Sequence, residues 1–228
     1  AAKDNLTDTG VKDSKISVIL NGVDGLKPVD DFEKMEIRER FGVKKGEKVI
    51  SIVARLEDIK GHMYFIEAAK MLIDEGVNAK FYIAGTGSYE DTLKAKVGEL
   101  GLEDNVIFTG FIQDVDRLMQ ITDIQVNASY GTEATSLALL EGMSLGIPAV
   151  VSDFGGNPGV ISDGENGYVV PKQNSTALKN AIMDLLSDSE KYDKMSERSR
   201  EIFNEKFTSR IMTKNTEALY IKTIGGKK

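Results

Sequence analysis

The feature that most constrains this chain is a series of short apolar runs rich in β-branched residues, separated by segments of helical character. The run at Lys48–Ala54 lacks a clean alternation of apolar and polar residues, as in a parallel strand buried on both faces. The other predicted strands are Lys80–Ala84, Asn105–Thr109, Asp123–Ala128, Ala149–Val151 and a short edge strand at Tyr168–Val170. Alternation of about six strands with helices predicts an α/β fold, with a mainly parallel sheet and helices on both faces.

Composition narrows the classes of function. The chain has 228 residues, 41% of them hydrophobic, which is sufficient for a full core. It contains no cysteine and one histidine, which excludes disulfides and thiolate metal sites and argues against zinc. The net charge of −7 argues against binding to nucleic acid. No apolar run approaches the length of a membrane span and no signal peptide is visible, so we expect a cytoplasmic protein.

The stretch Ser129–Asp153 carries two glutamates, Glu133 and Glu141, eight residues apart. Its pattern predicts a strand, a polar loop with Glu133, a helix that starts near Thr135 or Ser136, and a second strand. In this unit both carboxylates face the crevice at the carboxyl ends of the strands, where they can accept hydrogen bonds from sugar hydroxyls. The alternative is a solvated loop acid and a helix-surface acid.

The same helix has further predicted features. A hydroxyl of Thr132 or Thr135 can cap its start, and Gly146 follows its end. Gly142 lies in its interior, at a cost of about 1 kcal/mol relative to alanine. Close packing or a ligand would explain that glycine.

A pair of cations, Arg55 and Lys60, directly follows the strand Lys48–Ala54. Both therefore lie at the carboxyl edge of the sheet, where an arginine fork and a lysine charge can clamp a diphosphate. The alternative is a pair of surface cations without a ligand. His62 comes next and is expected to be structural or exposed rather than catalytic.

Glycine-rich loops follow two other predicted strands, at Gly85-Thr86-Gly87 and Gly155-Gly156. Glycines there let a ligand approach the backbone closely, although a tight turn before a helix would also need them. Neither loop matches the dinucleotide-binding Gly-x-Gly-x-x-Gly pattern, and no phosphate-binding Gly-Lys-Ser/Thr loop is present. Nicotinamide-dependent and NTPase functions are therefore disfavoured.

Taken in order, these motifs resemble the C-terminal half of a family 4 retaining glycosyltransferase of GT-B fold. The resemblance runs from about Lys15 to the end of the chain. It rests on Asn21-Gly22-Val23-Asp24, Arg55 with Lys60-Gly61, Gly85-Thr86-Gly87, Gly110-Phe111, Glu133 with Glu141, and Ser152-Asp153 followed by Gly155-Gly156-Asn157-Pro158. One departure is Gly159 after Pro158, where family members often have glutamate.

The resemblance implies a Rossmann-like domain that binds a nucleotide-diphospho-sugar, in which the sugar is joined to UDP, GDP or ADP. It implies that Arg55 and Lys60 bind the diphosphate, that Glu133 contacts the transferred sugar, and that Glu141 contacts the ribose. The implied catalytic residues are Arg55, Lys60 and Glu133. The remaining implied contacts are the first amides of the helix, at Thr135, Ser136 and Leu137, and the nucleobase region at Gly87, Phe111 and Ile112. No metal and no cofactor are implied.

The resemblance also implies a division of the chain and its partners. Residues 1–20 would be the remnant of an N-terminal domain, with its final strand at Lys15–Leu20. Residues 21–208 would form the nucleotide-sugar-binding domain, and residues 209–228 a helix that crosses back to the missing N-terminal domain. The acceptor would be a saccharide or a glycolipid, and many relatives lie on the inner face of the membrane. We expect a fragment that binds nucleotide weakly and does not catalyse transfer.

Two alternatives remain open on the sequence. A nucleotide-sugar 2-epimerase has the same fold but needs further acids and histidines that this chain lacks. A non-catalytic flavodoxin-like binding module would bind no nucleoside diphosphate and would be insensitive to changes at Arg55 or Glu141.

Overall fold

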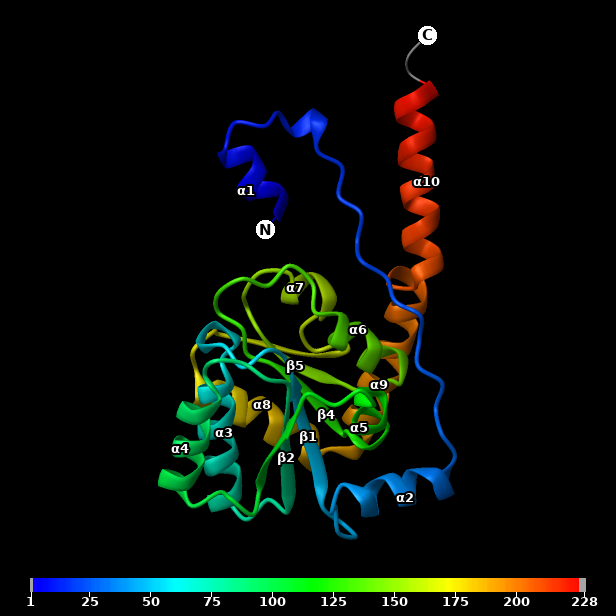
Figure 1. Ribbon diagram of the computed structural model, residues 1–228. Coiled ribbons are helices and arrows are strands. Elements are labelled where there is room, and N and C mark those ends of the chain that lie inside the picture. Colours follow the sequence, from blue (N-terminus) through cyan, green and yellow to red (C-terminus); the bar gives the residue numbers. More distant parts are fainter. Residues whose placement is uncertain (1, 226–228) are drawn as a thin grey trace.

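The computed structural model describes residues 2–225, and the body of the domain is one parallel sheet covered by helices on both faces (Figure 1). The strands are β1 (Lys48–Val53), β2 (Ala79–Ala84), β3 (Val106–Gly110), β4 (Ile124–Asn127), β5 (Ala149–Ser152) and β6 (Gly167–Val170). The helices are α1 (Ala2–Asp8), α2 (Asp31–Arg40), α3 (His62–Asp74), α4 (Glu90–Leu100), α5 (Val115–Ile121), α6 (Leu137–Ser144), α7 (Asn157–Val160), α8 (Ser175–Ser187), α9 (Ser189–Lys206) and α10 (Ser209–Gly225). Short 3₁₀ turns lie at η1 (Asp13–Lys15) and η2 (Asp58–Lys60).

The sheet has the order β3-β2-β1-β4-β5-β6, and every adjacent pair is parallel. This confirms the predicted α/β class and the short edge strand β6. The chain adds strands outward from β1 to β3, then returns to the other side of β1 to begin β4. The carboxyl ends of β1 and β4 therefore flank the point where the direction of winding changes, which is where ligands bind in open α/β sheets.

Each face of the sheet has its own core, because successive residues of a strand point to opposite sides. On β1, Ile50 and Ile52 pack with α3 and α8 on one face. The preceding residue, Val49, points to the opposite face and packs with α2 and α5. Beyond β4 that second face continues in a cluster from β5, α6 and α9. Burial on both faces explains why β1 shows no polar alternation in the sequence.

The predicted strand at Lys15–Leu20 is wrong. The turn η1 ends at Lys15, and the following residues are extended but pair with no strand among residues 2–225. A strand needs a neighbour for its backbone N–H and C=O groups, and this segment has none. Its apolar side chains are correspondingly open, with Val18 62% exposed.

The N-terminal segment and the segment that leads into α10 contact each other where they leave the domain. Val23 forms a short parallel bridge with Thr208, and the Cα of Gly22 lies so close that an added Cβ would be 2.3 Å from the Thr208 carbonyl oxygen. From Ser209, α10 extends beyond the body of the domain, and no side chain described on it is buried (Figure 1). None of the helices described in residues 2–225 combines the length and apolarity of a membrane span.

Candidate functional site

Two residues from neighbouring strand ends meet at the centre of the sheet edge. Lys60 lies in η2 after β1, and Glu133 lies in the loop after β4. The Lys60 ammonium is 3.1 Å from Oε2 of Glu133 and also donates to the carbonyl of Thr132 at 3.0 Å. Their side chains are only 12% and 9% exposed. The structure thus brings together two of the residues that the sequence predicted for one crevice.

Two further donors contact the same carboxylate. Asn127 Nδ2 and Ser129 Oγ donate to Oε2 of Glu133 at 3.3 and 3.0 Å. Both residues are buried, and the sequence analysis missed them because it interpreted the end of β4 as an apolar run. The polarity of Asn127 could have revealed this contact, since an asparagine inside a buried strand must find hydrogen-bond partners.

The glycine pair after β5 makes close contacts with the backbone of the Glu133 loop. A Cβ on Gly155 would lie 2.1 Å from the carbonyl oxygen of Glu133, and one on Gly156 would lie 1.7 Å from that of Ala134. The Gly156 amide donates to the Glu133 carbonyl at 2.9 Å. Only glycine leaves room for this close backbone contact, which holds the Glu133 loop against the loop after β5.

The Gly-Thr-Gly loop after β2 is explained in the same way. A Cβ on Gly85 would lie 2.1 Å from the carbonyl oxygen of Ala54, and one on Gly87 would lie 2.2 Å from that of Leu56. The loop therefore packs on the backbone of the segment that carries Arg55. Gly87 itself is exposed at the sheet edge.

Arg55 is an open cation next to this loop. Its side chain is 72% exposed, and its guanidinium is 2.9 Å from a carboxylate oxygen of Glu57. An exposed ion pair of this kind contributes about 0–1 kcal/mol, so a stronger anionic ligand can displace Glu57 from the guanidinium.

Neither predicted cap of α6, Thr132 or Thr135, is the observed one. The helix begins at Leu137, and Ser136 is the N-cap, with Oγ accepting from the Leu139 amide at 3.4 Å. Thr135 instead donates its hydroxyl to the Ala134 carbonyl at 2.8 Å. Leu137 is exposed, so the first turn of α6 opens toward solvent beside the Glu133 loop.

Glu141 lies within α6 and is half-buried. Burial raises its pKa, and the Asp116 carboxylate on α5 adds to that rise. The predicted nucleobase region lies on the segment just before α5. There Phe111 is 76% exposed, and Ile112 packs against the core between α2 and α5.

Gly142 is explained by a buried neighbour rather than by a ligand. An added Cβ would lie 2.1 Å from Oε1 of Gln125, a β4 residue that is 2% exposed. The Gln125 amide also donates to the carbonyl of Ala138 at 2.9 Å, which ties α6 to β4. His62 is likewise buried, and burial lowers its pKa to about 4, so it is a neutral core residue at pH 7.

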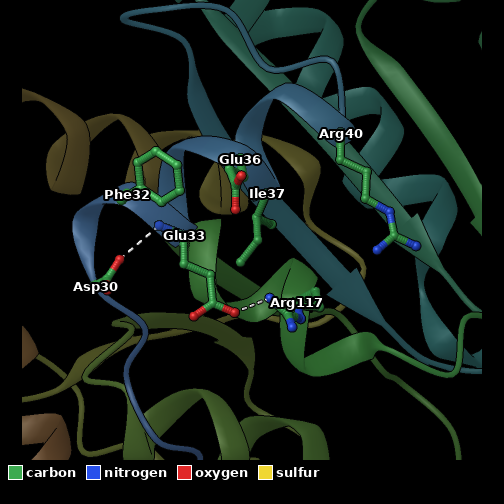
Figure 2. Close-up of a pocket in the computed structure, with 7 residues that line it drawn as sticks. All are labelled: Asp30, Phe32, Glu33, Glu36, Ile37, Arg40 and Arg117. Carbon is green, nitrogen blue, oxygen red and sulfur yellow. Dashed lines mark hydrogen bonds and ion pairs between the residues drawn. The ribbon is translucent and has the colours of Figure 1, made fainter.

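A cavity of about 850 Å³ opens beside Glu133, within the usual range for ligand pockets. Its walls come from the Glu133 loop, the loop after β5 and the N-terminal segment at 18–21. A second hollow of about 500 Å³ lies between α2 and α5, at the other end of the domain from α7 (Figures 1 and 2). Three of its charged side chains have partners within the protein, because Glu33 pairs with Arg117 and Asp30 caps α2 (Figure 2).

Comparison with known proteins places this geometry in a family. The sequence profile described as "Glycosyl transferases group 1" matches residues 33–202. The chain belongs to this family. It is similar to the putative glycosyltransferase EpsD of Bacillus subtilis, with 30% identity over 191 residues that cover 84% of this chain and 50% of EpsD. The chain spans about half the length of the curated relatives that it matches.

Solved structures agree with the family assignment. A crystal structure of Anabaena Alr3699/HepE in complex with UDP and glucose has a TM-score of 0.89 at 25% identity and covers 96% of this chain and 61% of that one. The C-terminal domain of the group 1 glycosyl transferase LpcC from Francisella tularensis has a TM-score of 0.74 at 26% identity and covers 82% of this chain and 100% of that one. The chain therefore has the fold of a GT-B C-terminal domain, as the sequence predicted.

Proposed function

We propose that this chain is the donor-binding domain of a retaining glycosyltransferase, which moves a sugar from a nucleotide-diphospho-sugar to a saccharide or lipid-linked acceptor. The observation that carries the proposal is the contact of Lys60 with Glu133 at the carboxyl ends of β1 and β4. A cation and a hydrogen-bond acceptor stand there side by side. They match the two halves of the ligand, a diphosphate and a hydroxyl-bearing sugar.

The proposed chemistry follows from the charges. Breaking the bond between the sugar and the diphosphate builds negative charge on the phosphates and positive charge on the anomeric carbon. Fixed cations at Arg55 and Lys60 stabilise the leaving diphosphate in that state, and the amides of Ser136 and Leu137 at the start of α6 add positive potential. Glu133 accepts a hydrogen bond from the sugar, and Glu141 from the ribose.

Similarity supports this assignment. The HepE structure was solved with UDP and glucose, and its fold covers nearly all of this chain. We propose the same class of ligand here, with the nucleobase near Gly87, Phe111 and Ile112. The proposed mechanism uses no metal and no cofactor, because side chains and helix amides supply the positive charge.

The division of the chain is also part of the proposal. We assign donor binding to residues 21–208 and contact with a further N-terminal domain to residues 1–20 and 209–228. The open side chains of the N-terminal segment and of α10 are consistent with surfaces that such a domain would cover. On this assignment the described chain binds nucleotide weakly and does not catalyse transfer. We also propose that the protein acts in the cytoplasm, at the inner face of the membrane.

Calorimetric titration of the chain with UDP, GDP and ADP tests the proposal. We expect one nucleotide to bind, and Arg55→Ala to weaken that binding by about 10- to 100-fold, which is the loss of one charge-assisted hydrogen bond. Arg40→Ala is a matched control, because Arg40 is 71% exposed and also faces a single carboxylate, that of Asp114 at 3.9 Å.

Three outcomes contradict the proposal. Failure of all three nucleotides to bind would favour the non-catalytic binding module. An unchanged dissociation constant in Arg55→Ala would remove that residue from the diphosphate site. An equal loss in the Arg40 control would place the nucleotide elsewhere or indicate a nonspecific effect of charge.

A further inference from the structure

We infer that Asn127 and Ser129 are positioning residues for Glu133: they engage one oxygen of its carboxylate so that the other is presented to the sugar of the donor. The inference rests on the proposed function and adds two residues that are not among the motif residues quoted from the sequence. Neither residue needs to touch the ligand.

The first argument is the distribution of contacts over the carboxylate. Lys60, Asn127 and Ser129 all donate to Oε2 of Glu133, at 3.1, 3.3 and 3.0 Å. A carboxylate oxygen has about two lone-pair sites, so three donors saturate it. All the hydrogen bonds that the described residues make with this carboxylate go to Oε2, which leaves Oε1 as a free acceptor beside the 850 Å³ cavity.

The second argument is that the two donors are themselves fixed. Asn127 Oδ1 accepts from the Ser129 amide at 3.1 Å, which orients the Asn127 side chain so that Nδ2 points to Glu133. Asn127 and Ser129 are 7% and 1% exposed, so solvent does not compete strongly for these bonds. Hydrogen bonds in such a buried network are stronger than in water and restrict each member to one orientation.

Two residues at and after the end of β5, Ser152 and Asn157, in turn hold Asn127 and Ser129 in place. The Ser152 hydroxyl donates to the Ser129 carbonyl. Asn157 Nδ2 donates to Ser152 Oγ at 3.0 Å and approaches the Asn127 carbonyl at 3.5 Å. The loop after β5, pressed on the Glu133 backbone by its glycines, thus also reaches the side chains that orient the carboxylate.

The consequence is a specific effect on sugar binding. A carboxylate held in one rotamer can meet a sugar hydroxyl without losing further side-chain freedom, and such support of a contacting residue is what a precise site requires. Loss of one donor frees Glu133 to rotate. The affinity that the sugar adds to the nucleotide should then fall. The nucleoside diphosphate itself, bound by Arg55 and Lys60, should keep its affinity.

The test compares each nucleotide sugar with its nucleoside diphosphate by calorimetric titration, using UDP-glucose with UDP, GDP-mannose with GDP and ADP-glucose with ADP. The measured quantity is the ratio of the two dissociation constants in the pair whose nucleotide binds. We expect Ser129→Ala to reduce the advantage of the sugar roughly 2- to 10-fold and to leave nucleoside diphosphate affinity within about twofold. Ser129→Thr, which keeps the hydroxyl, should restore the ratio.

Two variants complete the design. Ser51→Ala is the matched control, because Ser51 is a fully buried serine on β1 that accepts a 3.1 Å hydrogen bond from Thr122 and is not among the donors to Glu133. Asn127→Asp keeps the shape of the side chain but replaces its donor with a charge that repels Glu133. It should lower the ratio further than Ser129→Ala.

The outcomes separate the two levels of the argument. If no nucleoside diphosphate binds the unaltered chain, the proposed function fails and this inference fails with it. If a nucleotide binds but its sugar adds nothing in the unaltered chain, or if Ser129→Ala behaves as Ser51→Ala does, the positioning role alone is refuted. Equal weakening of nucleotide and nucleotide sugar in Ser129→Ala would assign Ser129 a merely structural role.

Discussion

Gly142→Ala in α6 should destabilise the domain, although alanine is the better helix former. Replacing a helical glycine by alanine ordinarily gains up to about 1 kcal/mol. Here the new Cβ would lie 2.1 Å from Oε1 of Gln125, far inside van der Waals contact. Gln125 is 2% exposed and bonded through its amide to Ala138, so it cannot move aside freely.

The magnitude follows from these opposing effects. Overpacking of a buried site costs about 1–3 kcal/mol, and weakening the Gln125 hydrogen bond adds about 1 kcal/mol. After subtraction of the gain in helix propensity, we expect a net loss of roughly 1–3 kcal/mol. For a domain of this size that corresponds to a fall in Tm of about 2–4 °C per kcal/mol.

Urea unfolding of Gly142→Ala should be compared with Gly98→Ala. Gly98 lies inside α4, where an added Cβ would meet only Glu103 at 3.7 Å, so this variant should be neutral or stabilising. Gln125→Ala combined with Gly142→Ala should cost less than the sum of the single changes, because removing the glutamine side chain relieves the overlap. Stabilisation by Gly142→Ala alone would refute the reasoning.

Three further predictions concern single side chains. Glu57→Gln should raise nucleoside diphosphate affinity up to about fivefold in calorimetric titration, because it frees Arg55 and removes a negative charge beside the ligand; a fall in affinity would contradict this. Ser136→Ala should cost about 1 kcal/mol in urea unfolding and Thr135→Ala much less, whereas the reverse order would restore Thr135 as the cap. Because burial lowers the pKa of His62 to about 4, the unfolded chain is protonated there first as the pH falls below about 6.5, and stability should decrease by about 2 kcal/mol between pH 7 and 5; His62→Gln should flatten that slope, and an unchanged slope would refute it.

The elements of the sheet were predictable because their signal is local. Apolar β-branched runs were enough to recover the six strands and their alternation with helices after residue 47. The segment Lys15–Leu20 shows the limit of that signal. Its composition suits a strand, but a strand exists only where a neighbour completes its hydrogen bonds, and a sequence pattern does not reveal the neighbour.

The candidate site was predictable in part. The motif positions brought Lys60 and Glu133 to the same edge because both follow parallel strands. Asn127 and Ser129 escaped notice because the end of β4 was interpreted as an apolar run, and only the folded loop brings the Glu133 carboxylate to them. The glycines after β2 and β5 were interpreted either as space for a ligand or as tight turns, and the structure adds a close approach between loops that neither interpretation included. Such contacts depend on strand order, which periodicity alone does not give.

The close packing of these loops also bears on the entropy of binding. The segments after β1, β2, β4 and β5 are each held by backbone contacts that only glycine allows, at Gly61, Gly87, Gly155 and Gly156. Folding has therefore already restricted the chain at the edge where the ligand is proposed to bind, and little freedom is left to lose there on association. Under that condition less of the free energy of each contact is offset by ordering of the chain, and the site should select among ligands by shape and charge rather than adapt to them.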